Sequence, residues 1–443
     1  MSASAKREAP ARFDLDGGAL ALLEASQALP LVSIVVSLRS GAGADPDGRG
    51  GLARIATRML RRGCEGLAAE QIDFRIDLLG AEMTVDTSTS TVAIHAQVIA
   101  RNLDPFVDLL ARLLGTPTFP EDELERLKRE TVAEIVEARD SDRVVAQKAL
   151  QRTFFEGHPY GRNPGGTTRS VEAIARADVL AFYRRHVVKG NAVIGLSGAI
   201  SPERAVEVAR RLVAVLPAGG ATTDATPEPA ARPGRRLLVV DKPERTQTQI
   251  LVATMGTSPH DEDHAPLIVG NAVFGGTFTS RLMREVRSKR GWSYGASARV
   301  SIDRRRQAWV MWTFPAATDA APCLRLTLDL MRTWVDGGVT PREVSFISRY
   351  LVRSHAFEID TAQKRLHQAL DVELLGLPAD YHSGWVDQVR AVTSESANAA
   401  IKRRIHPDDV LAVVVGTASS ILDPLRAAVD DLADVQVVPF DVE

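Results

Sequence analysis

The stretch PAGGATTDATPEPAARPG, residues 217–234, decides how the chain is organised. It contains four prolines, three glycines and no bulky apolar side chain, so it cannot bury one face in a hydrophobic core. It lies near the middle of the 443 residues. We therefore predict a linker at 217–234 that separates an N-terminal domain, residues 1–216, from a C-terminal domain, residues 235–443.

The two sides of this linker show the same order of elements. Leu31–Leu38 and Gln249–Met255 are typical of strands, and each precedes a loop rich in Gly, Asp and Pro and then a helix. Charged helices are expected at 121–139 and 342–357, each directly after a proline. These similarities predict two copies of one α+β unit, with chance similarity between amphipathic helices as the alternative.

Alternating apolar residues within each copy predict antiparallel sheet. Residues 81–99 are typical of a meander and residues 292–314 of a hairpin, because apolar side chains recur at every second position. Antiparallel strands with helices on one side form a two-layer sandwich. The predicted fold class is therefore α+β, with two homologous two-layer α/β sandwich domains, mainly antiparallel sheet with helices packed on one face, joined by the linker.

Composition excludes several classes of protein. Apolar residues make up 45% and charged residues 25%, as in ordinary globular proteins. Lys plus Arg is 54 and Asp plus Glu is 56, and this lack of basic excess predicts no nucleic-acid partner. The only cysteines, Cys64 and Cys323, exclude a cysteine-based zinc ribbon and leave one long-range disulfide open.

Neither a membrane span nor a leader is expected. The long stretches without Asp, Glu, Lys or Arg, Thr246–His260 and His264–Ser280, are both shorter than the ~20 apolar residues that a spanning helix needs. The first residues, MSASAKRE, have no apolar core of a signal peptide. We expect a cytoplasmic protein, and a periplasmic one stays open if a leader has been removed.

Signals of common catalytic motifs are few. No Gly-Lys dipeptide of a phosphate-binding loop occurs, and Gly195-Leu-Ser197-Gly-Ala199 lacks the last glycine of a G-x-S-x-G elbow. His260 and His264 alone share the spacing of two metal ligands on a helix, and prolines at 259 and 266 flank them. A solvated turn is favoured there over a metal site or a relocated peptidase site.

The segment GGLARIATRMLRRG, residues 50–63, carries a family resemblance. It is typical of an amphipathic helix that ends at a glycine, and it resembles the zinc-site helix of the pitrilysin/insulinase family. That family's motif is His-x-x-Glu-His, in which two histidines bind zinc and the glutamate activates water. Those places hold Arg54, Thr57 and Arg58 here, and a guanidinium cannot bind zinc.

Two further segments extend the resemblance. Glu134 stands where the family has its third zinc ligand, and we predict that Arg54 or Arg58 pairs with it; the alternative is a solvated glutamate. The segment FEGHPYGRNPGG, residues 155–166, resembles the family's His-Pro-Tyr-Gly loop, and members with and without the zinc motif carry it. The resemblance therefore implies a structural role for His158.

The segment GGTFTSRLMREVRSKRGWSYG, residues 275–295, is similar to a second landmark of the family. In active members an arginine and a tyrosine seven residues apart reach the substrate in the zinc site of the other domain. The match implies that Arg287 and Tyr294 bind substrate, with Arg287 near a helix end and Tyr294 at the start of the next strand. The alternatives are a surface arginine and a core aromatic residue.

Some family members divide these features between two chains. Because this sequence lacks the zinc motif but has the Arg/Tyr pair, it resembles the non-catalytic subunit of a processing-type peptidase. The resemblance implies that this chain holds no metal and no catalytic residue. It implies that the partner is a zinc-bearing homologous subunit in a heterodimer and that the substrate is a peptide. The isolated chain is expected to be inactive, and a homodimer stays open. The alternative is a catalytically inert structural or assembly protein, like the core subunits of respiratory complexes.

Overall fold

The structure is a computed structural model, and it describes residues 10–443. Its first large sheet has the strand order β1-β2-β8-β3-β7-β6. The strands are β1 (Ala11–Asp14), β2 (Leu20–Ala25), β3 (Leu31–Leu38), β6 (Glu82–Thr87), β7 (Val92–Ile99) and β8 (Ala192–Gly198). A small separate pair is formed by β4 (Gly63–Cys64) and β5 (Leu67–Ala68).

The second large sheet has the strand order β11-β12-β10-β13-β9-β14. Its strands are β9 (Arg235–Asp241), β10 (Gln249–Met255), β11 (Ala296–Val300), β12 (Ala308–Thr313), β13 (Leu411–Gly416) and β14 (Leu432–Pro439). The predicted strands at 31–38 and 249–255 are confirmed at both ends, and the meander and the hairpin are also present.

The two sheets share one topology. In the first, β2 runs parallel to β8, and β3 pairs antiparallel with both β8 and β7. In the second, β9 runs parallel to β13, and β10 pairs antiparallel with both β13 and β12. The sheets differ at one edge, where β1 is antiparallel to β2 but β14 is parallel to β9. The matching order agrees with the predicted repeat and is not expected from chance similarity of helices.

Helices cover one face of the first sheet. The side chains of β3 alternate between two cores, so that Ile34 and Val36 face these helices and Val35 faces the other way. The helices are α1 (Leu52–Met59), α2 (Ala69–Leu78), α3 (Leu103–Gly115), α4 (Glu121–Glu137), α6 (Thr168–Glu172), α7 (Arg176–His186) and α8 (Pro202–Ala214).

The second sheet is covered in the same way. Val239, Ile250 and Val252 of the sheet pack into a core with these helices. The helices are α9 (His264–Asn271), α10 (Arg281–Met283), α11 (Ala320–Gly337), α12 (Pro341–Glu358), α14 (Trp385–Ala391), α15 (Ser394–Arg404) and α16 (Ala418–Ala428). The predicted α+β fold class is confirmed.

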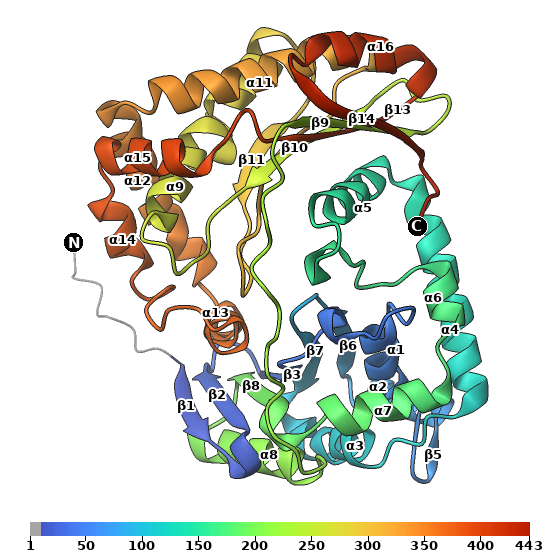
Figure 1. Cartoon of the computed structure of the whole chain (residues 1–443). Coiled ribbons are helices and arrows are strands. Elements are labelled where there is room, and N and C mark those ends of the chain that lie inside the picture. Colours follow the sequence, from blue (N-terminus) through green and yellow to red (C-terminus); the bar gives the residue numbers. More distant parts are fainter. Residues whose placement is uncertain (1–9) are drawn as a thin grey trace. The chain divides into compact units, whose positions relative to one another are not determined.

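Each sheet also has one helix on its opposite face. Helix α13 (Ala362–Leu375) lies against β2 and β8, with Leu366 and Leu370 buried there (Figure 1). Helix α5 (Asp142–Phe154) lies against β10 and β13. The sequence pattern did not predict this extra layer, because a single amphipathic helix does not show which sheet it covers.

The contacts divide the chain into two compact units, each made of three segments. The first unit comprises residues up to 135, 162–225 and 356–383; the second comprises 136–161, 226–355 and 384–443. Helix α5 thus belongs to the unit of the second sheet, and α13 belongs to the unit of the first. One change of unit, at 225/226, falls within the predicted linker, which has no helix or strand in residues 217–233.

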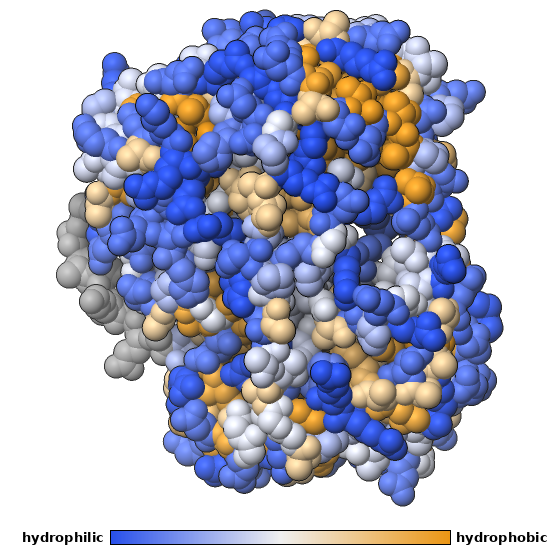
Figure 2. All heavy atoms as spheres, in the orientation of Figure 1, coloured by the Kyte–Doolittle hydropathy of each residue, from blue (hydrophilic) through white to orange (hydrophobic). Residues whose placement is uncertain are grey.

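The face drawn in Figure 2 is largely hydrophilic, with a hydrophobic patch over α16, β13 and β14. Val437 of the edge strand β14 is 45% exposed. Among residues 10–443, no helix combines the length and apolar character needed to cross a membrane. Cys64 and Cys323 are both buried and free, so the disulfide left open by the sequence is not formed.

Candidate functional site

The first part of the candidate site stands on α1, which is anchored at its N-terminus. Gly51 has φ of 91°, and a side chain there would clash with the backbone of Gly165. The Asp45 carboxylate accepts hydrogen bonds from the backbone N–H groups of Gly51 and Ala53, both at 2.8 Å. These contacts fix the direction in which the next side chains of α1 point.

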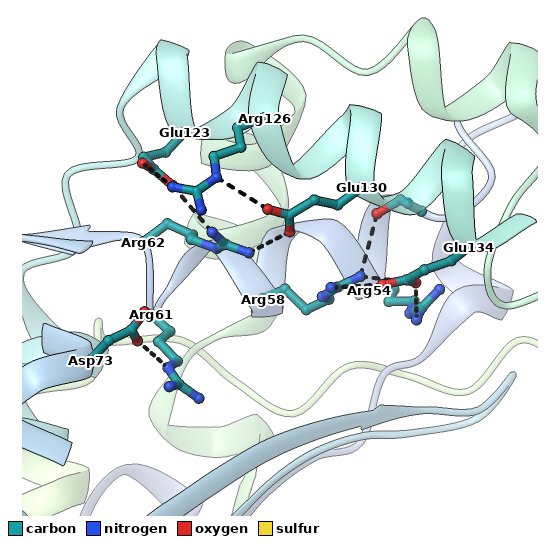
Figure 3. Close-up of polar contacts among 10 residues, drawn as sticks. Arg54, Arg58, Arg61, Arg62, Asp73, Glu123, Arg126, Glu130 and Glu134 are labelled. Carbon is teal, nitrogen blue, oxygen red and sulfur yellow. Dashed lines mark hydrogen bonds and ion pairs between the residues drawn. The ribbon is translucent and has the colours of Figure 1, made fainter. Parts of the chain in front are cut away.

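Arg54 and Arg58 both bind the carboxylate of Glu134 (Figure 3). Arg54 Nη2 lies 2.7 Å from Oε2, and Arg58 donates to both oxygens, from Nη2 at 3.0 Å and from Nη1 at 3.2 Å. The predicted ion pair is therefore present, and it includes both arginines. Since they stand one turn apart on α1, one carboxylate on α4 reaches both.

The charge of Glu134 is stabilised in this arrangement. Partial burial acts to raise its pKa, but the hydrogen bond from Arg58 and the charges of Arg54 and Arg58 outweigh it and hold the pKa below its ordinary value. The Glu134 side chain is 39% exposed, so water still screens the cluster. Glu134 is an ionised partner of two cations rather than a free acid or base.

Thr57 lies away from this cluster. It is fully buried, and its hydroxyl donates a hydrogen bond to the carbonyl of Ala53 within the same helix at 2.8 Å. A threonine hydroxyl is also a weak base compared with a carboxylate. This position therefore stabilises helix packing and has no group that could activate water.

The residues of this site do not fit zinc. Two guanidiniums and one carboxylate provide a single ligand type, and the guanidiniums repel a cation. Throughout residues 10–443, no group of three or more His, Cys, Asp and Glu has an arrangement that could hold a metal ion.

A second cluster of ion pairs, which sequence reasoning missed, joins α4 to the turn that follows α1. Arg62 lies in that turn and contacts Glu130 at 2.5 Å and Glu123 at 3.3 Å, and Arg126 contacts Glu130 at 3.2 Å (Figure 3). Since α1 ends at Met59, the expectation that its helix runs on to the glycine at 63 was wrong. Ion pairs therefore connect α4 both to α1 and to the turn after it.

Arg287 and Tyr294 lie close together in the second unit. Ser280 caps α10, whose chain continues into the π-helical segment η8 (Arg284–Lys289) that carries Arg287. Gly291 then adopts φ of 68° and ends the helical run, as predicted. Tyr294 lies in the connection before Ala296, the first residue of β11, so the prediction that it starts a strand was wrong by two residues.

The guanidinium of Arg287 contacts two aromatic rings. Its Cζ is 4.5 Å from the ring centre of Tyr294 and 4.8 Å from that of Phe278. Tyr294 is 77% exposed and Phe278 is 69% exposed, so Tyr294 is not a core aromatic residue. Within residues 10–443, no ion pair of the guanidinium and no hydrogen bond of the Tyr294 hydroxyl is present.

The His-Pro-Tyr-Gly loop is packed within the second unit. Tyr160 is buried, and its hydroxyl accepts a hydrogen bond from the backbone N–H of Arg305 at 2.9 Å. His158 contacts the carbonyl of Pro227 through Nε2 at 3.0 Å and accepts from the Tyr160 N–H through Nδ1 at 3.1 Å. These contacts give His158 a structural position, as the resemblance implied.

The expectation of a solvated turn around His264 was wrong. His264 is 3% exposed, starts α9 and contacts the Thr257 hydroxyl at 2.8 Å. Burial lowers its pKa to about 4. Asp261 and Asp263 bind Arg306 and Arg404, so the acidic residues between the histidines neutralise arginines. Only His260 is exposed, as the sequence suggested.

Comparison with known proteins identifies the class to which these features belong. The family model described as Insulinase (Peptidase family M16) matches residues 20–168, which include Arg54, Arg58 and Glu134. The model described as Peptidase M16 inactive domain matches residues 173–351, which include Arg287 and Tyr294. The chain belongs to the insulinase family, peptidase family M16, and it is an inactive-type member, which confirms the resemblance.

Its similarity to individual proteins extends over most of its length. It is 21% identical to the "Non-peptidase homolog YmxG" of Helicobacter pylori over 396 residues, 89% of this chain and 91% of that protein. A peptidase M16 inactive domain from Pseudomonas fluorescens has a TM-score of 0.84 and 26% identity, with 92% of this chain and 98% of that chain covered. A chain of complex III2 from Candida albicans shares the fold, with a TM-score of 0.78, 16% identity, and 94% and 98% coverage.

Proposed function

We propose that this chain is the non-catalytic, substrate-binding subunit of a heterodimeric zinc metallopeptidase. The arrangement of Arg287 and Tyr294 carries the proposal. Their polar groups have no partner within residues 10–443, yet the two side chains are held against each other by a cation–π contact of 4.5 Å. An unpaired and pre-oriented donor pair on the surface is suited to bind a group from outside the chain.

The two donors suit the chemistry of peptide hydrolysis. The guanidinium and the phenol can donate hydrogen bonds to a peptide carbonyl and to the oxyanion that develops when water attacks it. Phe278 also packs against Arg287 and reduces the conformational entropy lost on binding. Arg287 and Tyr294 would thus bind and orient the peptide, and the zinc and the general base would come from a zinc-bearing homologous subunit.

The test uses the full chain and the zinc-bearing family member from the same genome. We expect cleavage of an unstructured peptide only by the mixture, and no stoichiometric zinc in this chain alone by elemental analysis. Arg287→Ala should reduce kcat/KM of the mixture by roughly 100-fold, in the range found when an oxyanion donor is removed. Tyr294→Phe removes only the hydroxyl and should have a similar but smaller effect.

Arg284→Ala is the matched control. Arg284 is on the same π-helical segment, is 59% exposed, and makes only a 3.9 Å contact with Glu285. Its removal should leave kcat/KM unchanged. Zinc-dependent cleavage by this chain alone would contradict the proposal, and so would equal activity of the control and the Arg287→Ala, Tyr294→Phe double variant.

The second candidate is a catalytically inert structural or assembly protein. The shared fold with a chain of complex III2 supports it. If the double variant still forms the complex and activity is unchanged, the structural role is favoured. Size measurement of the isolated chain tests the homodimer in the same preparation.

A further inference from the structure

A groove in the second unit lies apart from the residues discussed so far. It is bounded by α12 and by the connection between α14 and α15, and its volume is about 600 Å³. All of its lining residues belong to that unit. Figure 1 shows these helices in orange to red.

The charges of the groove are mainly positive. Arg349, Arg353 and Arg390 line it, and Glu395 is its one acidic residue. Within residues 10–443, Arg353 has no ion pair or hydrogen bond, and Arg349 donates only to the Ser345 hydroxyl at 3.0 Å. Arg390 has one weak contact, to Asp387 at 3.5 Å, and both side chains are more than 60% exposed. These guanidiniums are therefore available to an anion.

The wall also carries an unsatisfied polar group. The hydroxyl of Ser348 is buried and has no hydrogen-bond partner among the described residues. A buried hydroxyl without a partner is costly, unless a ligand or water supplies one. Ser348 lines the same groove as Arg349 and Arg353. This second observation is independent of the charge.

The base of the groove is apolar. Val344 and Val392 are buried, Val352 is half-buried, and all three line the groove. Arginine forks match the oxygens of a phosphoryl group, and the valines offer a surface for a carbon skeleton. A volume of about 600 Å³ is within the range of small-molecule sites.

We propose that this groove binds a small organic phosphate. The phosphoryl oxygens accept hydrogen bonds from Arg349 and Arg353 and from the Ser348 hydroxyl, and Arg390 adds charge. The organic part lies on the three valines. The binding is independent of the Arg287 and Tyr294 site, so each of the two proposals stands or fails alone.

The experiment is titration calorimetry of the full chain with phenyl phosphate at low salt. We expect saturable binding that weakens as salt is raised. The Arg349→Ala, Arg353→Ala double variant should bind about tenfold more weakly or worse, because charge-assisted hydrogen bonds are lost. Ser348→Ala should have a smaller effect of the same sign.

Arg342→Ala is the control, because Arg342 is an exposed arginine of α12 outside the groove. It should bind phenyl phosphate like the wild type. If the double variant misfolds, Arg353→Lys serves in its place, since lysine keeps the charge but loses the fork, and weaker binding is expected. Unfolding midpoints of all variants are measured alongside.

Three results would overturn the proposal. If the wild type and the folded arginine variants bound phenyl phosphate equally, the groove would not be the binding site. Benzoate binding as tightly as phenyl phosphate would remove the preference for a phosphoryl group. If inorganic phosphate bound as tightly as phenyl phosphate, the valines would make no contribution to binding.

Discussion

Helices α1 and α9 occupy the same place in the two repeated topologies but differ in their polar side chains. Each is the first α-helix after the strand that pairs with β8 or β13. Helix α1 buries Ile55 and Met59 in the core and directs two arginines to the carboxylate of Glu134. Helix α9 buries Leu267 and Val269 completely and has no ion pair of this kind among the described residues. The fold therefore accepts at this place a helix with or without an ion-paired face.

The core of the second unit contains an aromatic cluster. The ring centres of Phe274 and Trp334 are 4.5 Å apart, and Trp309 lies within 5.9 Å of both. Hydrophobic burial stabilises without a specific partner, but an ion pair needs both members. Both units have a packed core, and we predict that Arg54, Arg58 and Glu134 of the first unit keep the geometry of a ligand site.

Replacing Arg54 and Arg58 by metal ligands tests whether α1 and α4 keep the geometry of a zinc site. This change should have the largest effect, which is a gain of zinc binding. The Arg54→His, Arg58→His double variant places two imidazoles one turn apart, beside the carboxylate that both arginines now contact. Two histidines and one glutamate form a three-ligand zinc set. We expect about one zinc per chain with micromolar affinity or better, roughly 8 kcal/mol of binding free energy.

The control adds Glu134→Ala to the double variant and should lose most of the zinc, as measured by elemental analysis after dialysis. If the double variant bound no zinc, the relative position of α1 and α4 would no longer allow the three side chains to coordinate a metal ion. Peptide cleavage is not expected even with zinc bound, because Thr57 is not a general base.

Removing an aromatic ring tests the apolar side of the comparison. Trp334→Ala leaves a cavity between Phe274 and Trp309 and should reduce the free energy of unfolding by about 3–5 kcal/mol. Urea unfolding with separate probes for the two units measures it. A loss below about 1 kcal/mol would mean that the second core relaxes around the cavity.

Each unit also buries one histidine against a hydroxyl from equivalent loops. His186 Nδ1 lies 3.0 Å from Ser40, which follows β3, and His264 Nδ1 lies 2.8 Å from Thr257, which follows β10. Burial lowers the pKa of each imidazole from 6.5 to about 4. The histidines come from different helices, so the two units bury a neutral imidazole by different routes.

This burial predicts loss of stability in acid. Between pH 6.5 and 4 the unfolded chain takes up protons that the folded chain does not, so stability falls as pH falls. From pH 7 to pH 5 each of His186 and His264 should cost about 2 kcal/mol. Unfolding by urea at both pH values should show a smaller loss in His264→Gln, and an unchanged loss in the exposed His260→Gln control. An equal loss in both variants would contradict the assignment.

Much of the fold and the first site followed from the sequence. Strand-like runs at 31–38 and 249–255 located β3 and β10, and the family resemblance that singled out Glu134 led to the prediction of its ion pair with Arg54 or Arg58. The helix on the second face of each sheet, and the burial of His264, did not follow. Both depend on contacts between residues far apart in the chain, which local periodicity does not encode. The roles of Arg287 and Tyr294 rest on family resemblance and stay proposals.

The smallest effect on stability is expected from changing Glu134 itself. This variant measures how much the ion pairs of Glu134 contribute to the free energy of unfolding. Glu134→Gln removes the charge that Arg54 and Arg58 share but keeps the size, and it should cost about 1 kcal/mol, because all three side chains are partly exposed. The matched variant in the second unit is Glu343→Gln, whose carboxylate binds Arg281 through both oxygens and whose pKa is lowered to about 2. Urea unfolding in 0.1 M and 1 M salt measures both. A loss for Glu134→Gln well above that of Glu343→Gln, and unchanged by salt, would show that the cluster is a structural cross-link between α1 and α4. A small and salt-sensitive loss would show instead that the ion pairs are screened by solvent and contribute little to stability.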